Sequence, residues 1–251
     1  MTGFIALLKK ELKEQLKTHK LLIITVVFFV FGVTTPLLLK YMPEIMKLAG
    51  EDILINYPVP TALQALEEYT GTIAQVGVLV VVMITMGAIA QERGRGTAAM
   101  TLSKPVAWGA FIFAKMVAIA ISSAIAIAIA SIICYIYTVL LLGEVNISAF
   151  IFLNLLLVLF LMLCISVTLL FSSIFTSQLA AGGVALVVLI GQALLVQIPW
   201  VGSYLPGKLI NWGTELLAGG NSNSWGAMGM SLVIIIVCLF LARVILQRKE
   251  I

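Results

Sequence analysis

The chain has 251 residues, of which 62% are hydrophobic and only 10% are charged. An ordinary soluble domain has roughly 45–50% apolar and about 25% charged residues, whereas the mean hydropathy here is +1.16. This composition excludes a soluble globular enzyme and predicts a membrane protein. The net charge of +4 describes how basic residues are placed around the spans, and it does not require a nucleic-acid partner.

The segment 1–20 precedes the first apolar run and is predicted to be an amphipathic helix. Its apolar residues fall along one helical side and several lysines fall along another; these are Phe4, Ile5, Leu8, Leu12 and Leu16 against Lys10, Lys13 and Lys17. Such a helix lies in the membrane interface, with its apolar side in the lipid and its lysines toward anionic headgroups. A basic tail that only sets the topology is the alternative.

Six long apolar runs follow, and each contains a charge-free stretch near or above the roughly 17–25 residues that a spanning helix needs. They predict transmembrane helices at about 21–39, 72–90, 116–142, 147–171, 179–198 and 225–246. The third run contains AIAIAIASI, which alternates as a strand does. An open strand in lipid would leave its backbone polar groups unpaired, so a helix is expected there too. The predicted fold class is therefore an all-α membrane protein, a single transmembrane domain over 1–251.

Basic residues mark one side of these spans. Of the 15 Lys and Arg residues, all but Lys40, Lys47 and Lys208 lie in the N-terminal segment, between the second and third spans, or at the C-terminal end. The positive-inside rule therefore predicts that both termini and the segment 91–108 are cytoplasmic. We expect a multi-pass protein of the cell membrane. Its acidic outer segment, 40–71, is predicted to be a loop with a short surface helix after Pro60.

Residues that usually carry catalysis are scarce. His19 is the only histidine, which excludes a His-based metal site or a Ser/His pair within the membrane. The segment GSYLPGKL departs from the phosphate-loop pattern at Leu209, where Ser or Thr would hold magnesium. We therefore expect no catalytic residue, no cofactor-binding site and no metal site in this chain. The predicted spans also carry no ionisable residue in their cores, which disfavours an ion-coupled carrier.

The cytoplasmic segment 91–108, QERGRGTAAMTLSKPVAW, separates two long apolar runs. Its glycines break the helix that leaves the second span, Thr97 can cap a short helix, and Pro105 ends that helix. This arrangement predicts a helical knob on the cytoplasmic surface that docks a partner. A plain topological loop is the alternative. A second, shorter cytoplasmic contact is predicted at 172–178.

The run from Glu92 to Thr97, ERGRGT, followed by LSKP and by Lys115 at the next span, resembles the cytoplasmic segment of ABC-2 type permeases. That resemblance implies a six-helix, type V exporter-like permease fold, a second permease subunit in a homodimer or heterodimer, and two separate ABC ATPase subunits that would bind ATP and magnesium. It also implies a coupling helix that contacts the ATPase. By position, its residues are Glu92, Arg93, Gly96, Thr97, Leu102 and Pro105.

The outer segment 199–224 is too apolar for an aqueous loop and too interrupted to span, which predicts short helices that return into the outer leaflet. In the family that the chain resembles, this region lies near the exit of the pathway. We therefore predict an outer gate at Trp200, Pro206 and Trp212, with an interfacial cap anchored by aromatic residues as the alternative.

Together these features predict the permease subunit of an ATP-driven exporter, which forms the translocation pathway and couples to a separate ATPase. Spans rich in Ile, Val, Leu and Ala favour a peptide antibiotic or a lipid-like compound as substrate. One alternative is a stand-alone channel or secondary carrier. Another is a membrane anchor that binds a cytoplasmic partner without transport.

Overall fold

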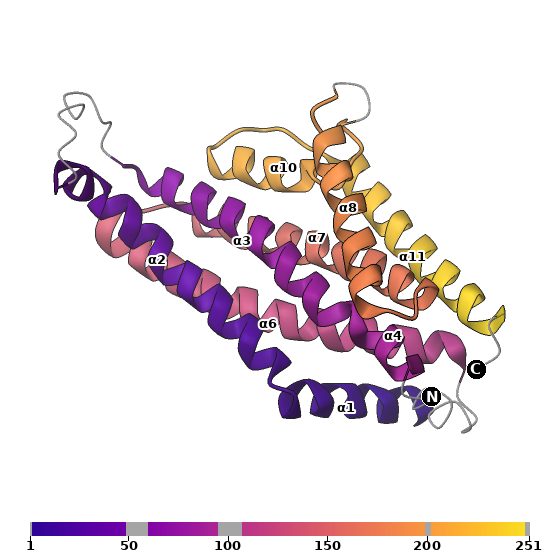
Figure 1. Cartoon of the computed structure of the whole chain (residues 1–251). Coiled ribbons are helices and arrows are strands. Elements are labelled where there is room, and N and C mark those ends of the chain that lie inside the picture. Colours follow the sequence, from indigo (N-terminus) through magenta and orange to yellow (C-terminus); the bar gives the residue numbers. More distant parts are fainter. Residues whose placement is uncertain (1, 49–59, 95–106, 199–201, 249–251) are drawn as a thin grey trace.

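The computed structural model describes residues 2–48, 60–94, 107–198 and 202–248, and nearly all of them are helical (Figure 1). The helices are α1 (Thr2–Lys17), α2 (Lys20–Leu48), α3 (Ala62–Thr85), α4 (Gly87–Gly94), α6 (Trp108–Leu142), α7 (Ile147–Ile174), α8 (Gln178–Leu195), α10 (Lys208–Leu217) and α11 (Trp225–Arg248). Within the described ranges, α2, α3 continued by α4, α6, α7, α8 and α11 are long and apolar enough to cross a membrane. The prediction of an all-α protein with six spans is confirmed.

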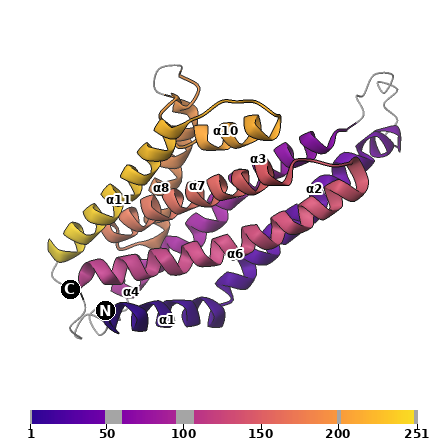
Figure 2. The ribbon, with the colours of Figure 1, turned by 180° about the vertical axis from the view of Figure 1, so that it is seen from behind.

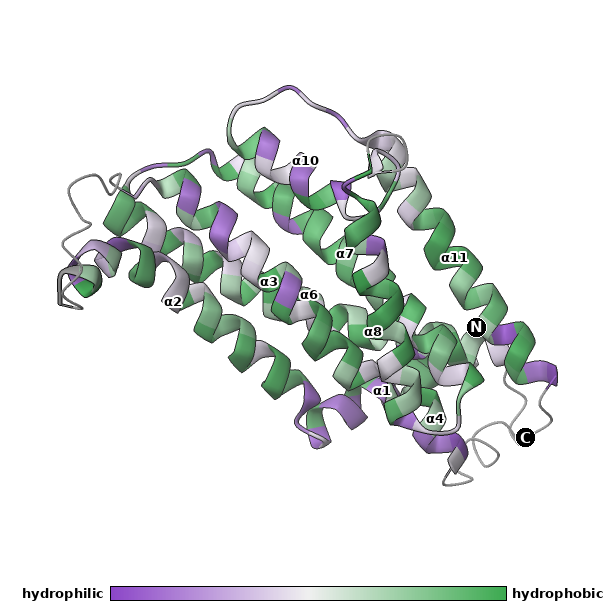
Figure 3. Cartoon of the chain, turned by 45° about the horizontal axis from the view of Figure 1, so that its top comes forward, coloured by the Kyte–Doolittle hydropathy of each residue, from purple (hydrophilic) through white to green (hydrophobic). Residues whose placement is uncertain are grey.

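The spanning helices run alternately in opposite directions (Figure 1). As a result α1, α4 and the end of α11 share one end of the molecule, while α10 and the α6–α7 turn lie at the other. We call the first of these the basic end, because it carries Lys9, Lys10, Arg93 and Arg248. Apolar residues cover most of the spans, and many hydrophilic residues lie near their ends (Figure 3).

Helix α3 begins about three turns before the predicted second span. Thr61 caps it: its hydroxyl accepts from the Gln64 backbone N–H at 3.3 Å, and the Gln64 side chain accepts from the Thr61 N–H at 3.0 Å. This capping box satisfies two of the N–H groups that a helix start leaves unpaired. A helix does begin just after Pro60, as predicted, but it is continuous with the second span, so Glu67 and Glu68 lie on the first turns of α3 and not in an outer loop.

Helix α7 is the centre of the bundle. It packs against α3, α4, α6, α8, α10 and α11, and 61% of its most apolar stretch is buried within the chain, compared with 22% for α8. The exposed parts of α2, α8 and α11 carry large apolar side chains, including Phe29, Val187 and Phe240. Because a lipid bilayer is as apolar as these side chains, such exposure is what spanning helices require.

Helices α2 and α6 cross closely at Gly32. A side-chain carbon at this position would lie 2.7 Å from the Ala130 carbonyl oxygen, a backbone atom of α6. Small residues allow two membrane helices to approach each other in this way. The crossing joins α2 to α6 and so supports the helices that carry the basic end.

We expect Gly32→Ala to destabilise the protein by about 1–3 kcal/mol, because the added methyl group must push the two backbones apart. Thermal unfolding of the purified protein in nanodiscs measures this effect. Gly229→Ala in α11 is the matched control, since nothing lies within 4 Å of its added carbon. The control should be neutral or stabilise by up to about 1 kcal/mol. Equal unfolding temperatures for the two variants would contradict the close crossing.

Candidate functional site

Helix α1 lies across the basic end and packs beneath α6 (Figure 2). Residues spaced four apart share one face of a helix, and on α1 this face consists of Leu7, Glu11 and Gln15, all buried. The predicted apolar side is only partly covered by protein, because Ile5 and Leu16 are exposed. The sequence analysis did not predict that α1 also presents polar residues, Glu11 and Gln15, to the protein.

A buried ion cluster joins α1, α4 and α6. The Lys115 ammonium lies 3.0 Å from both carboxylate oxygens of Glu11 and 2.8 Å from Glu92 Oε1. The Lys115 side chain is 2% exposed, and the two carboxylate side chains are 9% and 14% exposed. Lys10, on the exposed side, lies 3.4 Å from Glu92 Oε1. The cluster ties the base of the segment 91–108 to two other helices.

Helix α6 begins at Trp108, so Lys115 lies two turns inside a continuous helix rather than in a loop before it. The third span was predicted to begin at about residue 116, and in the structure its helix starts eight residues earlier, at Trp108. Burial of an ammonium group requires paired charge, and Glu11 and Glu92 supply it. The Phe111 ring adds a cation–π contact, with its centroid 5.0 Å from the Lys115 nitrogen.

The sequence predicts that this chain has no metal site, and the same carboxylates bear on that prediction. Glu11, Glu14 and Glu92 each have an oxygen within 4.8 Å of the others, a spacing that would suit a cation. The Lys115 ammonium, however, contacts two of these three residues directly. The chain thus supplies the positive charge that this group of carboxylates needs.

The second span is broken near the basic end, and α7 bridges the break. Met86 separates α3 from α4. The Ser172 hydroxyl accepts from the backbone N–H groups of Ile89 at 3.1 Å and Ala90 at 3.0 Å, and it donates to the Met86 carbonyl at 2.8 Å. One buried side chain therefore replaces the hydrogen bonds that the interruption removes. We call this contact the Ser172 clasp.

Two of the predicted coupling residues lie at the end of α4, and both are held in place. Glu92 belongs to the ion cluster, and the Arg93 guanidinium donates to the Ser173 carbonyl at 2.9 Å. The other four, Gly96, Thr97, Leu102 and Pro105, fall outside the described residues. The structure therefore places the base of the predicted coupling helix at a junction of α1, α4, α6 and α7, which we call the basic-end junction.

A cavity of about 560 Å³ opens between α3, α8 and α10. Its polar lining consists of uncharged amides, Gln75, Gln192, Gln197 and Asn211, set among apolar side chains. No charged residue of the described chain lines it. Clefts of this size, mostly apolar with a few polar groups, are typical ligand sites.

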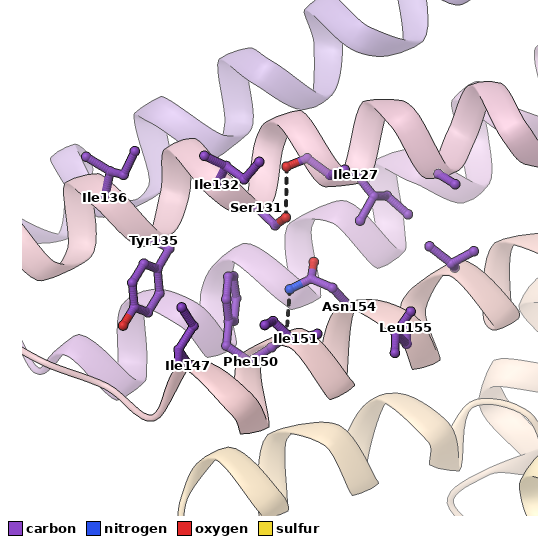
Figure 4. Close-up of a pocket in the computed structure, with 13 residues that line it drawn as sticks. Ile127, Ser131, Ile132, Tyr135, Ile136, Ile147, Phe150, Ile151, Asn154 and Leu155 are labelled. Atoms are coloured by element: carbon purple, nitrogen blue, oxygen red, sulfur yellow. Dashed lines mark hydrogen bonds between the residues drawn. The ribbon is translucent and has the colours of Figure 1, made fainter.

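A second hollow, of about 480 Å³, lies between α6 and α7 (Figure 4). Its lining is almost wholly apolar, and its polar atoms bond within the chain. Asn154 donates to the Phe150 carbonyl, Ser131 donates to the Ala128 carbonyl, and Tyr135 donates to the Val145 carbonyl. In this hollow, the Asn154, Ser131 and Tyr135 side chains therefore need no ligand as a hydrogen-bond acceptor.

The predicted outer gate falls partly on α10. Trp212 is buried, lies edge-on to Phe152 and Trp225 with ring centroids 5.2 and 5.4 Å away, and donates to the Ser222 carbonyl at 2.7 Å. Pro206 is buried just before the helix, and Trp200 lies outside the described residues. Trp212 does not line the α3–α8–α10 cavity, whereas its neighbour Asn211 does. A role of these residues as a gate stays a prediction.

Comparison with known proteins covers nearly the whole chain. The chain is 27% identical over 249 residues to an uncharacterized transmembrane protein, YxlG, of Bacillus subtilis (strain 168), and the match covers 97% of this chain and 95% of that protein. A family model described as ABC-2 family transporter protein matches residues 5–251, a range that includes every helix of the basic-end junction and of the cavity. The chain therefore belongs to the ABC-2 family of transporter proteins, which makes it a multi-pass membrane subunit for transport.

Proposed function

We propose that this chain is the permease subunit of an ATP-driven exporter and that the basic-end junction couples it to the ATPase. The family implies association with ATPase subunits, and a transport subunit of this kind is not itself catalytic. The observation that carries the coupling proposal is the fixation of α4. Glu92 is held by α6 and α1, Arg93 by α7, and the break before α4 by Ser172.

This geometry provides a mechanical route from the junction to the cavity. A push on the segment 91–108 acts on α4, and the Ser172 clasp passes the displacement to α7. Helices α3 and α7 both line the cavity, through Gln75 and Phe160 among others. Movement of α4 relative to α3 at the Met86 break would therefore shift α7, and with it Phe160, relative to the α3 wall of the cavity.

The cavity supports a substrate class as part of the same proposal. Amide side chains donate and accept hydrogen bonds without carrying charge, and the surrounding wall is apolar. An amphipathic compound with uncharged polar groups, such as a peptide antibiotic or a lipid-like molecule, fits this chemistry. We place the basic end in the cytoplasm of a cell-membrane protein, following the positive-inside rule.

The proposed assembly contains a second permease subunit and two ATPase subunits, which would hold ATP and magnesium. Helix α8 is the least buried span, and its exposed residues include Leu179, Val187 and Leu194. It also forms one wall of the cavity. A second copy packed against α8 would cover these exposed apolar residues, which supports a dimer.

Co-expression with the partner ATPase tests the coupling. We expect Glu92→Gln to lower the ATPase activity of the reconstituted complex, because the neutral amide no longer forms an ion pair with Lys115. The decrease should be roughly 5-fold or more, which corresponds to a typical coupling free energy between two sites. Glu144→Gln is the matched control: it removes the same charge at an exposed site on the opposite end. Equal activity of the two variants would contradict coupling at the junction. If no ATPase co-purifies with the wild type, a stand-alone carrier or a membrane anchor takes its place.

A further inference from the structure

Helix α1 has three faces, and one of them is buried against the protein. Glu11 and Gln15 lie on the protein face and are buried. Ile5 and Leu16, 54% and 60% exposed, lie on an uncovered apolar face. Three exposed lysines occupy the remaining side, which we call the lysine face; they are Lys9, Lys13 and Lys17. At 100° per residue these lysines follow one another along a single side of the helix.

The position of α1 places these free faces at the membrane surface. The helix ends at Lys17, the chain turns at His19 with a left-handed φ of 57°, and the spanning helix α2 begins at Lys20. This corner turns α1 away from the direction of α2, so that α1 lies at the basic end, beside the first turns of α6 (Figures 1 and 2). An apolar face beside a cationic face, at the depth where a span enters the bilayer, is complementary to anionic phospholipids.

The protein face of the same helix holds the base of the proposed coupling segment. Glu11 contacts the Lys115 ammonium that also binds Glu92. Lys10, next to Glu11 in the chain, bridges to Glu92 from the exposed side. Gln15 accepts a hydrogen bond from Ser122 of α6 one turn further on. A displacement of α1 would therefore change the pairing of Glu92 directly.

We infer that anionic lipids stabilise the position of α1 and, through it, the position of α4. Anionic headgroups bound to the lysine face fix α1 at the membrane surface, and Glu11 then holds the Lys115–Glu92 pair and with it α4. On a neutral surface the lysine face loses its counter-charges and α1 is held less firmly. Glu11 then contacts Lys115 less often and Lys10 contacts Glu92 less often, so fewer contacts hold α4. The effect on transport rests on the proposed function, whereas the lipid contact and its transmission to α4 do not.

Hydrogen exchange on the full chain in nanodiscs tests this inference without an ATPase. The nanodiscs contain either phosphatidylcholine alone or phosphatidylcholine with phosphatidylglycerol. For the wild type, we expect the anionic lipid to slow exchange of the amides of α1 and of α4, by roughly 5-fold or more in α4. Amides in the middle of α7 should not respond, and they report that the fold is intact.

Three variants separate the steps. With Lys9, Lys13 and Lys17 changed to Gln, both helices should lose their response to phosphatidylglycerol, whereas the same three changes to Arg should keep it because the charge remains. Glu11→Gln combined with Lys10→Gln leaves the lysine face complete but removes both ionic contacts of α1 with the Lys115–Glu92 pair, so α1 should still respond while α4 does not. A full lipid response of the Gln triple variant would overturn the inference. So would a wild type in which α1 responds and α4 does not.

Discussion

Lys115→Ala is expected to destabilise the protein by about 3–5 kcal/mol, which is the cost of leaving buried charges without their partner. The substitution would leave the carboxylates of Glu11 and Glu92 largely buried, with only the partly exposed Lys10 as a cation near them. The loss should appear as a lower unfolding temperature of the protein in nanodiscs, followed by the fluorescence of its 4 tryptophans. The proposed complex should also lose coupled ATPase activity.

The triple variant Glu11→Met, Glu92→Met, Lys115→Met tests whether unpaired charge causes the instability of Lys115→Ala. Replacing a whole buried ion cluster by apolar residues of similar volume is often neutral for stability. We therefore expect this variant to regain most of the stability that Lys115→Ala loses, yet to remain defective in coupling. A triple variant as unstable as Lys115→Ala would contradict this explanation, because it has no unpaired carboxylate and keeps a side chain of similar size at position 115.

Ser172→Ala should give the second large effect. It removes the shared acceptor of the Ile89 and Ala90 N–H groups and the donor to the Met86 carbonyl. A buried polar group left unsatisfied costs about 1–3 kcal/mol, and here several are affected at one place. We expect a loss of stability in or above that range. Hydrogen exchange at Ile89 and Ala90 should rise more than exchange elsewhere in the spans.

Ser123→Ala in α6 is the matched control for the clasp. Ser123 is equally buried, but its hydroxyl donates to the Ile119 carbonyl within its own helix. Removing the Ser123 hydroxyl breaks only this hydrogen bond within α6 and leaves the hydrogen bonds between helices intact. This variant should therefore lose less stability, and hydrogen exchange at α4 should not rise. If the two alanine variants behave alike, the Ser172 clasp does not stabilise the break in the second span.

The number and course of the spans could be predicted from the sequence because hydropathy over about 20 residues is a strong signal in a bilayer. The ends were less predictable. Charged residues marked the predicted ends of the spans. The second span was therefore predicted to start after Glu67 and Glu68, and the third after Lys115. In the structure a capping box starts α3 at Ala62, and buried partners keep Lys115 inside α6. Charged residues therefore lie on the helices rather than before them.

The basic-end junction could be predicted only in part. The resemblance of their segment to ABC-2 permeases identifies Glu92 and Arg93. The predicted second cytoplasmic contact at 172–178 stays a prediction, although Ser172 at its start contacts α4 within the chain. Glu11 was missed because amphipathicity sorts residues into apolar and charged sides, whereas α1 buries a carboxylate for pairing with an ammonium 104 residues away. Such a pair has no local pattern. The isolated Lys115 between apolar neighbours was the one available signal.

The central place of α7 has a consequence for biosynthesis. Chains are made from the N-terminus, so α1, α2 and α6 can associate through the Gly32 crossing and the Glu11–Lys115 pair before the fourth span is inserted. Helices α8, α10 and α11 have α7 as their shared neighbour. A nascent chain halted before Ile147 would therefore hold a half-built bundle in the membrane, with the α6 face that α7 covers still open to lipid and to quality-control proteases.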